Sequence, residues 1–383
     1  MLTGILLGVV VGVITGLIPG FNLSLFFLLA YQQRLETSLL FYFFLVGAIT
    51  NTLVGQITML TPVAVAGDPI FLKPMNAMIK LGLGQRAVAH AFYSFAFNLA
   101  LVLACGIVLI FAGEIEFLSL SKEYITLSFC LATLLWIALI CLAENKILTI
   151  LYLIIVCSLS FLTIEKFPDN SMLILATALY GIGFGFTTKP VSIPPQYDGL
   201  PEESYWSFTQ AGVGFFGGYL IGLPTSAMCA VIGEETDDPN FTIATTSQAK
   251  GTAMGMGLLF LLTNTGARDT ASTYISFLKL DVDPGSAIAI LFFLLLLILF
   301  LCEAYPILVT FYIRVMRVIP PNLVTCFVLS LNIFTLFHFV GWITPVLVLI
   351  GFSLAKLVEH AGIPPGASLC AISIVPIYSL FSS

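Results

Sequence analysis

The sequence predicts an all-α polytopic membrane protein with about 10 to 12 transmembrane helices. Of its 383 residues, 59% are hydrophobic and 9% are charged, whereas a soluble domain carries about 25% charged residues. The apolar residues form continuous blocks, which argues against the alternating strands of a membrane β-barrel. Two glycine ladders of the same spacing further predict that the helices form two structural repeats with Pro/Gly-broken helices.

The candidate spans are separated by short polar segments, and a helix needs about 20 apolar residues to cross a bilayer. In chain order they are residues 2–31, 38–60, 85–112, 124–142, 147–164, 171–186, 208–232, 251–277, 285–312, 323–340, 342–358 and 367–381. The first span has no charged n-region, so we interpret it as a membrane helix and not as a cleaved signal peptide.

Each glycine ladder leads into a proline inside an apolar segment. The first ladder is Gly8, Gly12 and Gly16, followed by Pro19, and the second is Gly214, Gly218 and Gly222, followed by Pro224. Residues 1–165 are therefore predicted to form a first membrane repeat and residues 208–383 a second. Residues 166–207, with one hydrophobic segment and a proline-rich loop, form the linker. If the first repeat holds five spans, an odd number, the second enters the membrane from the opposite side and the repeats are inverted.

A proline break starts a new half-helix whose free N–H groups carry a partial positive charge. Such an end can bind an anion, and neighbouring hydroxyl and amide groups would replace the water around a carboxylate. The predicted substrate-binding residues are Pro19, Gly20, Asn22, Ser24, Pro224, Thr225, Ser226 and Arg268. The alternative is that the kinks and ladders only pack helices together, and that Arg268 and Asp269 form a surface pair at a helix end.

The same polar tripeptide follows each ladder, as Thr50-Asn51-Thr52 and as Thr263-Asn264-Thr265. Unpaired polar groups are costly inside a membrane, and oxygen-rich clusters near a helix break suit a sodium ion. The predicted ion-coordinating residues are Asn51, Thr52, Gln56, Asn264, Thr265 and Asp269. The alternative is that these Asn and Thr side chains join helices by hydrogen bonds. No organic cofactor is expected, and a sodium ion or a proton would serve as the coupling ion.

Two other polar features are weaker candidates for ion coupling. Residues 234–238 form an acidic run after the second broken helix, and His90 lies in an apolar segment near Arg86. Protonation or cation binding at either could couple transport to an ion gradient. The alternatives are a solvated loop for residues 234–238 and a packed or interfacial histidine. The net charge of −6 offers no basic face, so no nucleic-acid partner is expected.

Three stretches resemble one known family. The run GVITGLIPGFN at residues 12–22 is similar to the opening signature of the tripartite tricarboxylate transporter permease family (TctA). Residues 66–98 resemble that family's loop and following helix, and residues 351–376 resemble its last two spans, joined by a Gly-x-Pro turn. The chain is shorter than the bacterial permeases and closer to shorter archaeal-type members. Its second proline site, residues 222–226, lacks the Pro-Gly pair of the family pattern.

The resemblance implies carboxylate uptake through a membrane permease that works with a small membrane subunit and an extracytoplasmic binding protein. We therefore expect a secondary active transporter of small organic anions in the cytoplasmic membrane of a prokaryote, acting by ion-coupled alternating access. The sequence is also compatible with a homodimer.

Three other classes of function share some of these sequence features. A translocase of a polyprenyl-phosphate or other anionic lipid carrier would use the same anion-binding helix ends and is the main alternative. A channel fits less well, because two broken helices favour alternating access. An enzyme is not expected, since Gly67-Asp68 and Tyr197-Asp198 have neither the order nor the setting of an intramembrane aspartyl protease.

Overall fold

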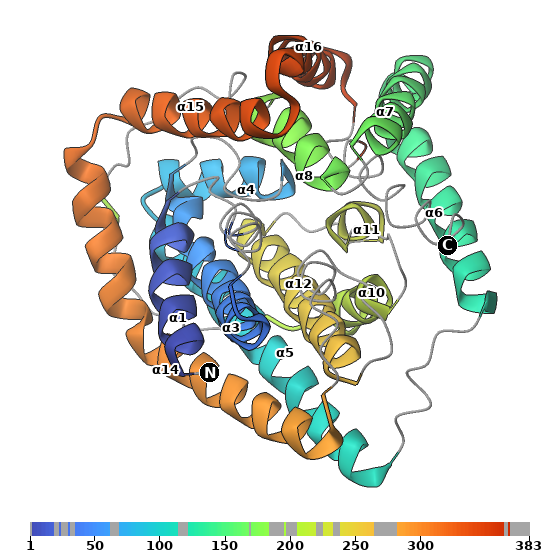
Figure 1. Cartoon of the computed structure of the whole chain (residues 1–383). Helices are drawn as coiled ribbons and strands as arrows, with labels where there is room; N and C mark the ends of the chain where they lie inside the picture. Colours follow the sequence, from blue (N-terminus) through green and yellow to red (C-terminus); the bar gives the residue numbers. More distant parts are fainter. Residues whose placement is uncertain are drawn as a thin grey trace.

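The computed structural model describes residues 2–18, 23, 30, 35–61, 69–113, 122–167, 170–183, 195–196, 205–219, 225–232, 238–263, 282–363 and 367. Every regular element in these ranges is helical, and the helices pack into one bundle (Figure 1). The prediction of an all-α protein is therefore confirmed for the described part of the chain.

The first half of the chain contains α1 (Leu2–Leu17), α3 (Thr37–Gly55) with its 3-10 continuation η1 (Gln56–Leu60), α4 (Pro69–Lys80), α5 (Gly84–Ala112), α6 (Lys122–Leu142) and α7 (Lys146–Lys166). Next come α8 (Ser171–Ala176) and the π-helical turn η3 (Thr177–Ile182). The second half contains α10 (Phe208–Tyr219), α11 (Thr225–Ile232), α12 (Pro239–Leu262), α14 (Pro284–Val318), α15 (Pro321–Val340), η4 (Gly341–Ile343) and α16 (Thr344–Ala361).

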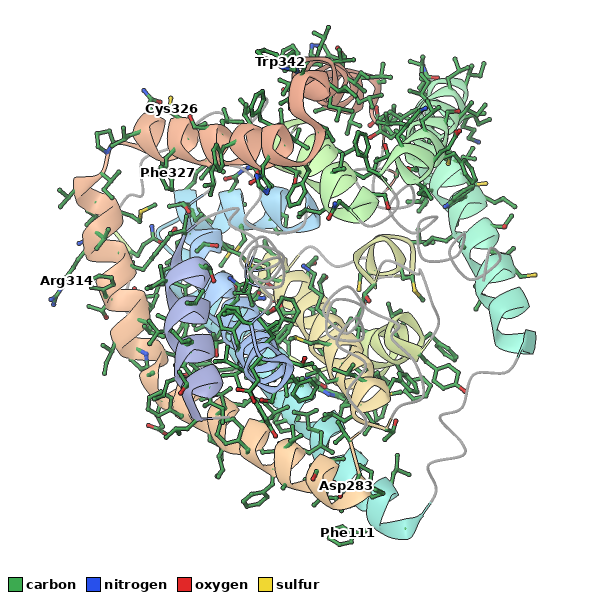
Figure 2. The ribbon with its side chains drawn as sticks, in the orientation of Figure 1. Phe111, Asp283, Arg314, Cys326, Phe327 and Trp342 are labelled. Carbon is green, nitrogen blue, oxygen red and sulfur yellow. The ribbon has the colours of Figure 1, made fainter. Side chains whose placement is uncertain are left out.

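Five helical segments of the described chain are long and apolar enough to cross a membrane. They are Thr37–Leu60, Gly84–Ala112, Lys146–Lys166, Pro284–Val318 and Asn322–Ala361. Large apolar side chains also cover the outside of the bundle, among them Phe111, Phe327 and Trp342 (Figure 2). Such an exterior suits lipid and would be unusual for a soluble protein, in which contiguous apolar patches are small.

Helix α12 begins earlier than the sequence predicted. The span expected at residues 251–277 starts at Pro239, twelve residues before Gly251. Its first half is rich in Thr, Ser and Gln, which lowers its hydropathy, yet these side chains are buried. The hydroxyl of Thr245 donates to the carbonyl of Phe241 at 2.8 Å, so part of this polarity is satisfied within the helix. The low hydropathy of these residues therefore did not indicate that they are buried inside the bundle.

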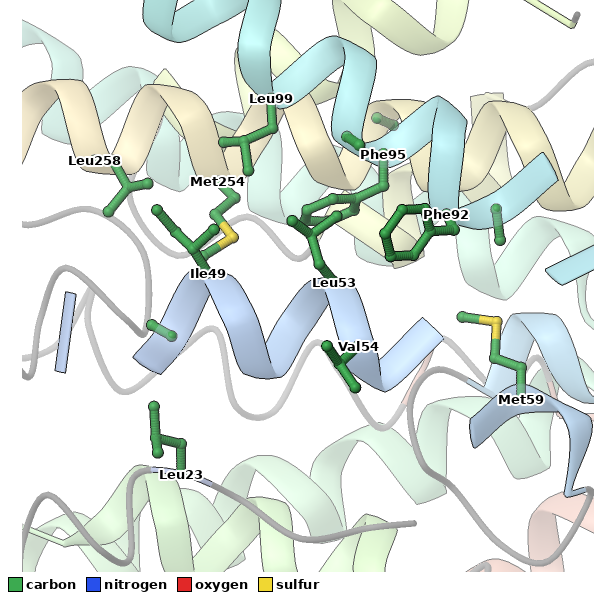
Figure 3. Close-up of a cluster of buried hydrophobic side chains, with 14 of the residues drawn as sticks. Leu23, Ile49, Leu53, Val54, Met59, Phe92, Phe95, Leu99, Met254 and Leu258 are labelled. Carbon is green, nitrogen blue, oxygen red and sulfur yellow. The ribbon is translucent and has the colours of Figure 1, made fainter. Parts of the chain in front are cut away.

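The centre of the bundle is built from α3, α5 and α12. Figure 3 shows Ile49 and then Leu53 along α3, opposed by Leu99 and then Phe95 of α5, with Met254 of α12 beside them. Helix α5 therefore runs opposite to α3. A methyl group added to Gly255 would lie 2.8 Å from Cβ of Val102, and one added to Gly106 would lie 2.6 Å from Cδ1 of Leu259. The residue numbers of the contacting positions increase together along the two helices, so α5 and α12 run in the same direction.

Asp283 caps the N-terminus of α14. Its carboxylate accepts hydrogen bonds from the Ser286 N–H group at 3.0 Å and from the Ser286 hydroxyl at 2.6 Å. Such caps satisfy backbone donors that have no partner within the helix. These bonds, led by that of the hydroxyl, hold the pKa of Asp283 below its usual value.

The cap predicts a pH-dependent effect on stability. A lowered folded-state pKa adds stability above the unfolded aspartate pKa of about 3.9, and that stability is lost as the pH falls through the folded pKa. We expect Asp283→Ala to lower the melting temperature at pH 7 and the gap to the unchanged protein to shrink below about pH 3.9. Thermal melts in detergent across this range measure the gap. A gap that is the same at both ends of the range contradicts the assignment.

Candidate functional site

The first glycine ladder packs α1 directly against α3. A methyl group added to Gly8 would lie 2.7 Å from the carbonyl oxygen of Phe43, and one added to Gly12 would lie 2.9 Å from that of Gly47. Gly4 and Gly16 meet the carbonyl oxygens of Leu39 and Asn51 in the same way. Each glycine thus faces the residue 35 positions later, and the two helices run parallel with their backbones in contact.

The second ladder packs α10 against α12 in the same register. A methyl group added to Gly218 would lie 2.6 Å from the carbonyl oxygen of Ala253, and Gly214 faces that of Ala249. Each again faces the residue 35 positions later. Because α12 runs opposite to α3, the α10–α12 pair points the opposite way from the α1–α3 pair. The shorter helix α11 follows α10 after residues 220–224, the region in which the break at Pro224 was predicted.

Asn51 joins α3 to α1 through side chains. Its amide group donates a hydrogen bond to the Thr15 hydroxyl at 2.8 Å, and Thr15 donates in turn to the carbonyl of Val11 at 2.7 Å. Thr15 is buried at the end of the ladder, beside Gly16. This contact is the helix-joining role given above as the alternative to ion coordination. It occupies an amide donor of Asn51, whereas ion coordination would use the amide oxygen.

Thr50, Thr52 and Gln56 lie at the end of α3, where the α-helix tightens into η1. Thr52 donates to the carbonyl of Ala48 at 2.8 Å, and the Gln56 amide donates to the carbonyl of Thr52 at 3.2 Å. The buried Thr50 Oγ1 and Gln56 Oε1 have no hydrogen-bond partner within the described chain. These two oxygens therefore have free capacity to accept a hydrogen bond or to bind a cation, and Gln56 remains a candidate ligand for a hard cation.

The two polar tripeptides do not occupy equivalent positions in the two helix pairs. Cβ of Thr50 faces Gly12, and the residue that faces Gly218 in the same way is Met256. Thr263 comes seven residues after Met256, at the end of α12, where its hydroxyl donates to the carbonyl of Leu259 at 2.9 Å. Spacing along the sequence suggested a match between the tripeptides that packing does not reproduce.

The residues predicted around the proline breaks lie mostly outside the described ranges. Thr225 is described and begins α11, where its hydroxyl faces Gly217 of α10. Ser226 follows it in α11, and its side chain is outside the described residues. Nothing is described for Pro19, Gly20, Asn22, Ser24, Pro224, Asn264, Thr265, Arg268 and Asp269, nor for residues 234–237. Asp238, which ends the acidic run, caps α12 by accepting from the N–H group of Asn240 at 2.9 Å.

A buried polar contact that sequence reasoning missed lies at the start of α10. The Ser207 N–H group donates to Oε1 of Gln248 at 3.0 Å, and Nε2 of Gln248 donates to the Ser207 carbonyl at 3.0 Å. Gln248 is fully buried in α12, and Ser207 is buried as well. The nearby Gln210 is buried with no described hydrogen-bond partner for Oε1. The run of polar residues before Gly251 was the available signal, and the late start assigned to this span concealed it.

His90 occupies a packed position in α5. Its ring lies 5.0 Å from that of Tyr205, and Tyr205 packs at 5.9 Å against Phe241 of α12. The segment around Tyr205 and Ser207 thus bridges α5 and α12. This placement agrees with the interpretation of His90 as a packed histidine.

Comparison of the chain with protein families, with characterised proteins and with solved structures finds no match.

Proposed function

We propose that the protein is a secondary active transporter of small organic anions, with carboxylates as the substrate class, that works by ion-coupled alternating access between two inverted repeats. The resemblance of residues 12–22, 66–98 and 351–376 to the tripartite tricarboxylate transporter permeases supplies the substrate class. In this proposal the protein resides in the cytoplasmic membrane of a prokaryote and acts with a small membrane subunit and an extracytoplasmic binding protein.

The observation that carries the proposal is the packing of the two glycine ladders. Both ladders face their partner helix with an offset of 35 residues, and the two pairs point in opposite directions. Chance similarity of composition would not give equal registers. An internal duplication with inversion does, and it is the architecture in which alternating access is commonly built.

The broken helices supply the proposed substrate site. Helix α10 ends at Tyr219 and α11 begins at Thr225, and in the proposal the corresponding break of the first half is at Pro19. In the proposal, the free N–H groups of the two half-helices hold the anion, and Arg268 contributes a charge. In the proposal, Gln56 and the residues around Asn264 bind a coupling cation, and Asn51 lies near the first break because it bonds Thr15, four residues before Pro19.

Transport in reconstituted vesicles tests the proposal. We expect uptake of one or more radiolabelled di- or tricarboxylates, dependent on a sodium or proton gradient, and a loss of about tenfold or more on Pro224→Ala. Pro345→Ala is the matched control, because Pro345 lies in the first turn of α16, where the missing N–H group of a proline breaks no helical hydrogen bond. Vesicles that take up no carboxylate but move a polyprenyl phosphate between leaflets would replace this function with the lipid-carrier alternative.

A further inference from the structure

Glu303 lies deep within α14, the longest continuous α-helix of the described chain. Helix α14 runs from Pro284 to Val318, and Glu303 is 19 residues after its start and 15 residues before its end. In the other four membrane-length helices, the carboxylates Glu165 and Glu359 lie within three residues of a helix end. A carboxylate at the depth of Glu303 is costly and marks a functional site by default.

The depth of Glu303 in the membrane can be judged from Tyr305, two residues further along α14, which packs on α5. The Tyr305 ring lies 4.5 Å from that of Phe92 and 5.2 Å from that of Tyr93, both in α5. These residues are about 13 Å from the start of α5, whose 29 residues span about 43 Å. A hydrocarbon core of about 30 Å centred on α5 would begin about 7 Å from that start and would therefore include this level.

Glu303 is exposed on the side of α14 that faces away from the bundle. Leu299, Phe300 and Ile307 lie three or four residues from it, on the same helical face, and are 61%, 61% and 74% exposed. The side chain of Glu303 is itself exposed. A single carboxyl group thus interrupts an apolar stripe that would contact lipid.

No basic side chain of the described chain pairs with Glu303. Arg314, the nearest base on α14, is eleven residues away, about 16 Å along the helix, and α14 bends between Asp283 and Arg314 (Figure 2). Pro306 lies inside the helix and cannot donate to the carbonyl of Cys302, which accounts for a bend.

The titratable groups of α5 on this side are Tyr93, His90 and Arg86. Tyr93 packs on Tyr305 of α14, whereas His90 packs on Tyr205 and Arg86 lies a further turn toward the start of α5. Cys302 and Tyr305 are neighbours of Glu303 along α14. Of the other elements packed on α14, α3 carries only Tyr42 as a titratable group, and η1 carries none. The buried Tyr305 hydroxyl has no hydrogen-bond partner in the described residues. Phenol and thiol groups can donate a hydrogen bond to a carboxylate, but none supplies a positive charge.

We propose that Glu303 binds a proton and is the coupling carboxyl of this protein. The inference rests on the proposed transport function and assigns the proton as the coupling ion. While Glu303 faces lipid, it carries the proton as a neutral carboxylic acid, because an isolated carboxylate in hydrocarbon costs far more. Movement of α14 about Pro306 brings the carboxyl to water, where the proton leaves. A proton from water on the other side then binds the same carboxylate.

Labelling with dicyclohexylcarbodiimide tests the site without any transport assay. This lipid-soluble reagent adds to protonated carboxyl groups in apolar surroundings. We expect an adduct on Glu303, found by peptide mass spectrometry of the protein in vesicles, and slower labelling as the pH is raised. Glu359 is the internal control, because it is exposed at the end of α16 and forms an ion pair of 2.7 Å with Lys356. Equal labelling of Glu303 and Glu359, or none on Glu303, overturns the proposal.

A second measurement uses Glu303→Gln, which mimics the protonated acid. We expect this variant to fold, to be unlabelled and to lose proton movement, measured with a pH-sensitive dye inside the vesicles, while Glu303→Asp retains part of it. Carboxylate uptake with unchanged proton movement in Glu303→Gln would overturn the inference and leave the transport function standing. Labelling of Glu303 in a protein that takes up no organic anion would contradict the proposed transport function and leave the proton-binding site at Glu303 standing.

Discussion

Gly218→Ala is expected to destabilise the protein, whereas Gly212→Ala in the same helix is expected to leave stability unchanged or to raise it. A methyl group at Gly218 would lie 2.6 Å from the carbonyl oxygen of Ala253 and 2.7 Å from Cβ of Met256. Both atoms belong to α12 at positions that cannot move without shifting its backbone. Overpacking of this kind costs about 1–3 kcal/mol.

The matched control has the opposite expected sign. A methyl group at Gly212 would meet no atom within 4 Å, and alanine favours a helix over glycine by about 1 kcal/mol. Thermal melts of the two purified variants in detergent, followed by size-exclusion chromatography, measure the difference. Equal melting temperatures for Gly218→Ala and Gly212→Ala would mean that α10 and α12 do not pack as described.

The first ladder provides a parallel comparison. Gly12→Ala would bring a methyl group within 2.7 Å of Cβ of Thr50, whereas one at Gly55 would meet no atom within 4 Å. If the two helix pairs are equivalent, Gly12→Ala and Gly218→Ala should lower stability by similar amounts. Under the proposed two-repeat architecture, both variants should also impair transport, because each loosens one of the two helix pairs.

The helical class and the five membrane-length segments of the described chain could be predicted from the sequence because they depend on local composition. The apolar runs that became α5, α7 and α14 carry few charges over more than 20 residues, and no tertiary contact is needed to recognise them. The ladders could also be read, since glycines four residues apart form a single helical stripe. The helices that pack against the ladders could not be predicted, because a glycine stripe does not indicate which other helix it will contact.

The polar residues were harder to place for the same reason. Whether Asn51 binds an ion or Thr15 depends on the position of α1, and the equivalence of the two tripeptides depends on the packing of Gly12 and Gly218. Glu303 was overlooked because a lone charge scarcely changes the hydropathy of a 35-residue helix. Gln248 was overlooked because polar composition excluded its segment from the span. Both become visible only when burial and neighbours are known.

Gln248→Leu is expected to give the largest loss of stability among substitutions in the polar interior. The carboxamide of Gln248 satisfies both backbone groups of Ser207, at 3.0 Å each, and both residues are buried. Leucine has a similar size but neither donates nor accepts, so the Ser207 N–H group would lose this acceptor, while the Ser207 carbonyl would keep the bond from the Ala211 N–H group at 3.0 Å. A buried backbone donor that loses its partner costs about 1–3 kcal/mol.

Thr245→Val separates this effect from a general loss of polarity. Thr245 is also buried in α12, but its hydroxyl bonds the carbonyl of Phe241 within the same helix, so valine removes a side-chain bond and leaves no backbone donor unpaired. We expect melting in detergent to drop strongly for Gln248→Leu and by little for Thr245→Val. Hydrogen exchange should also speed up at the Ser207 amide only in Gln248→Leu. Unchanged exchange at Ser207 would show that Gln248 does not hold the start of α10 against α12, and the bridge between α5, α10 and α12 would then need another cause.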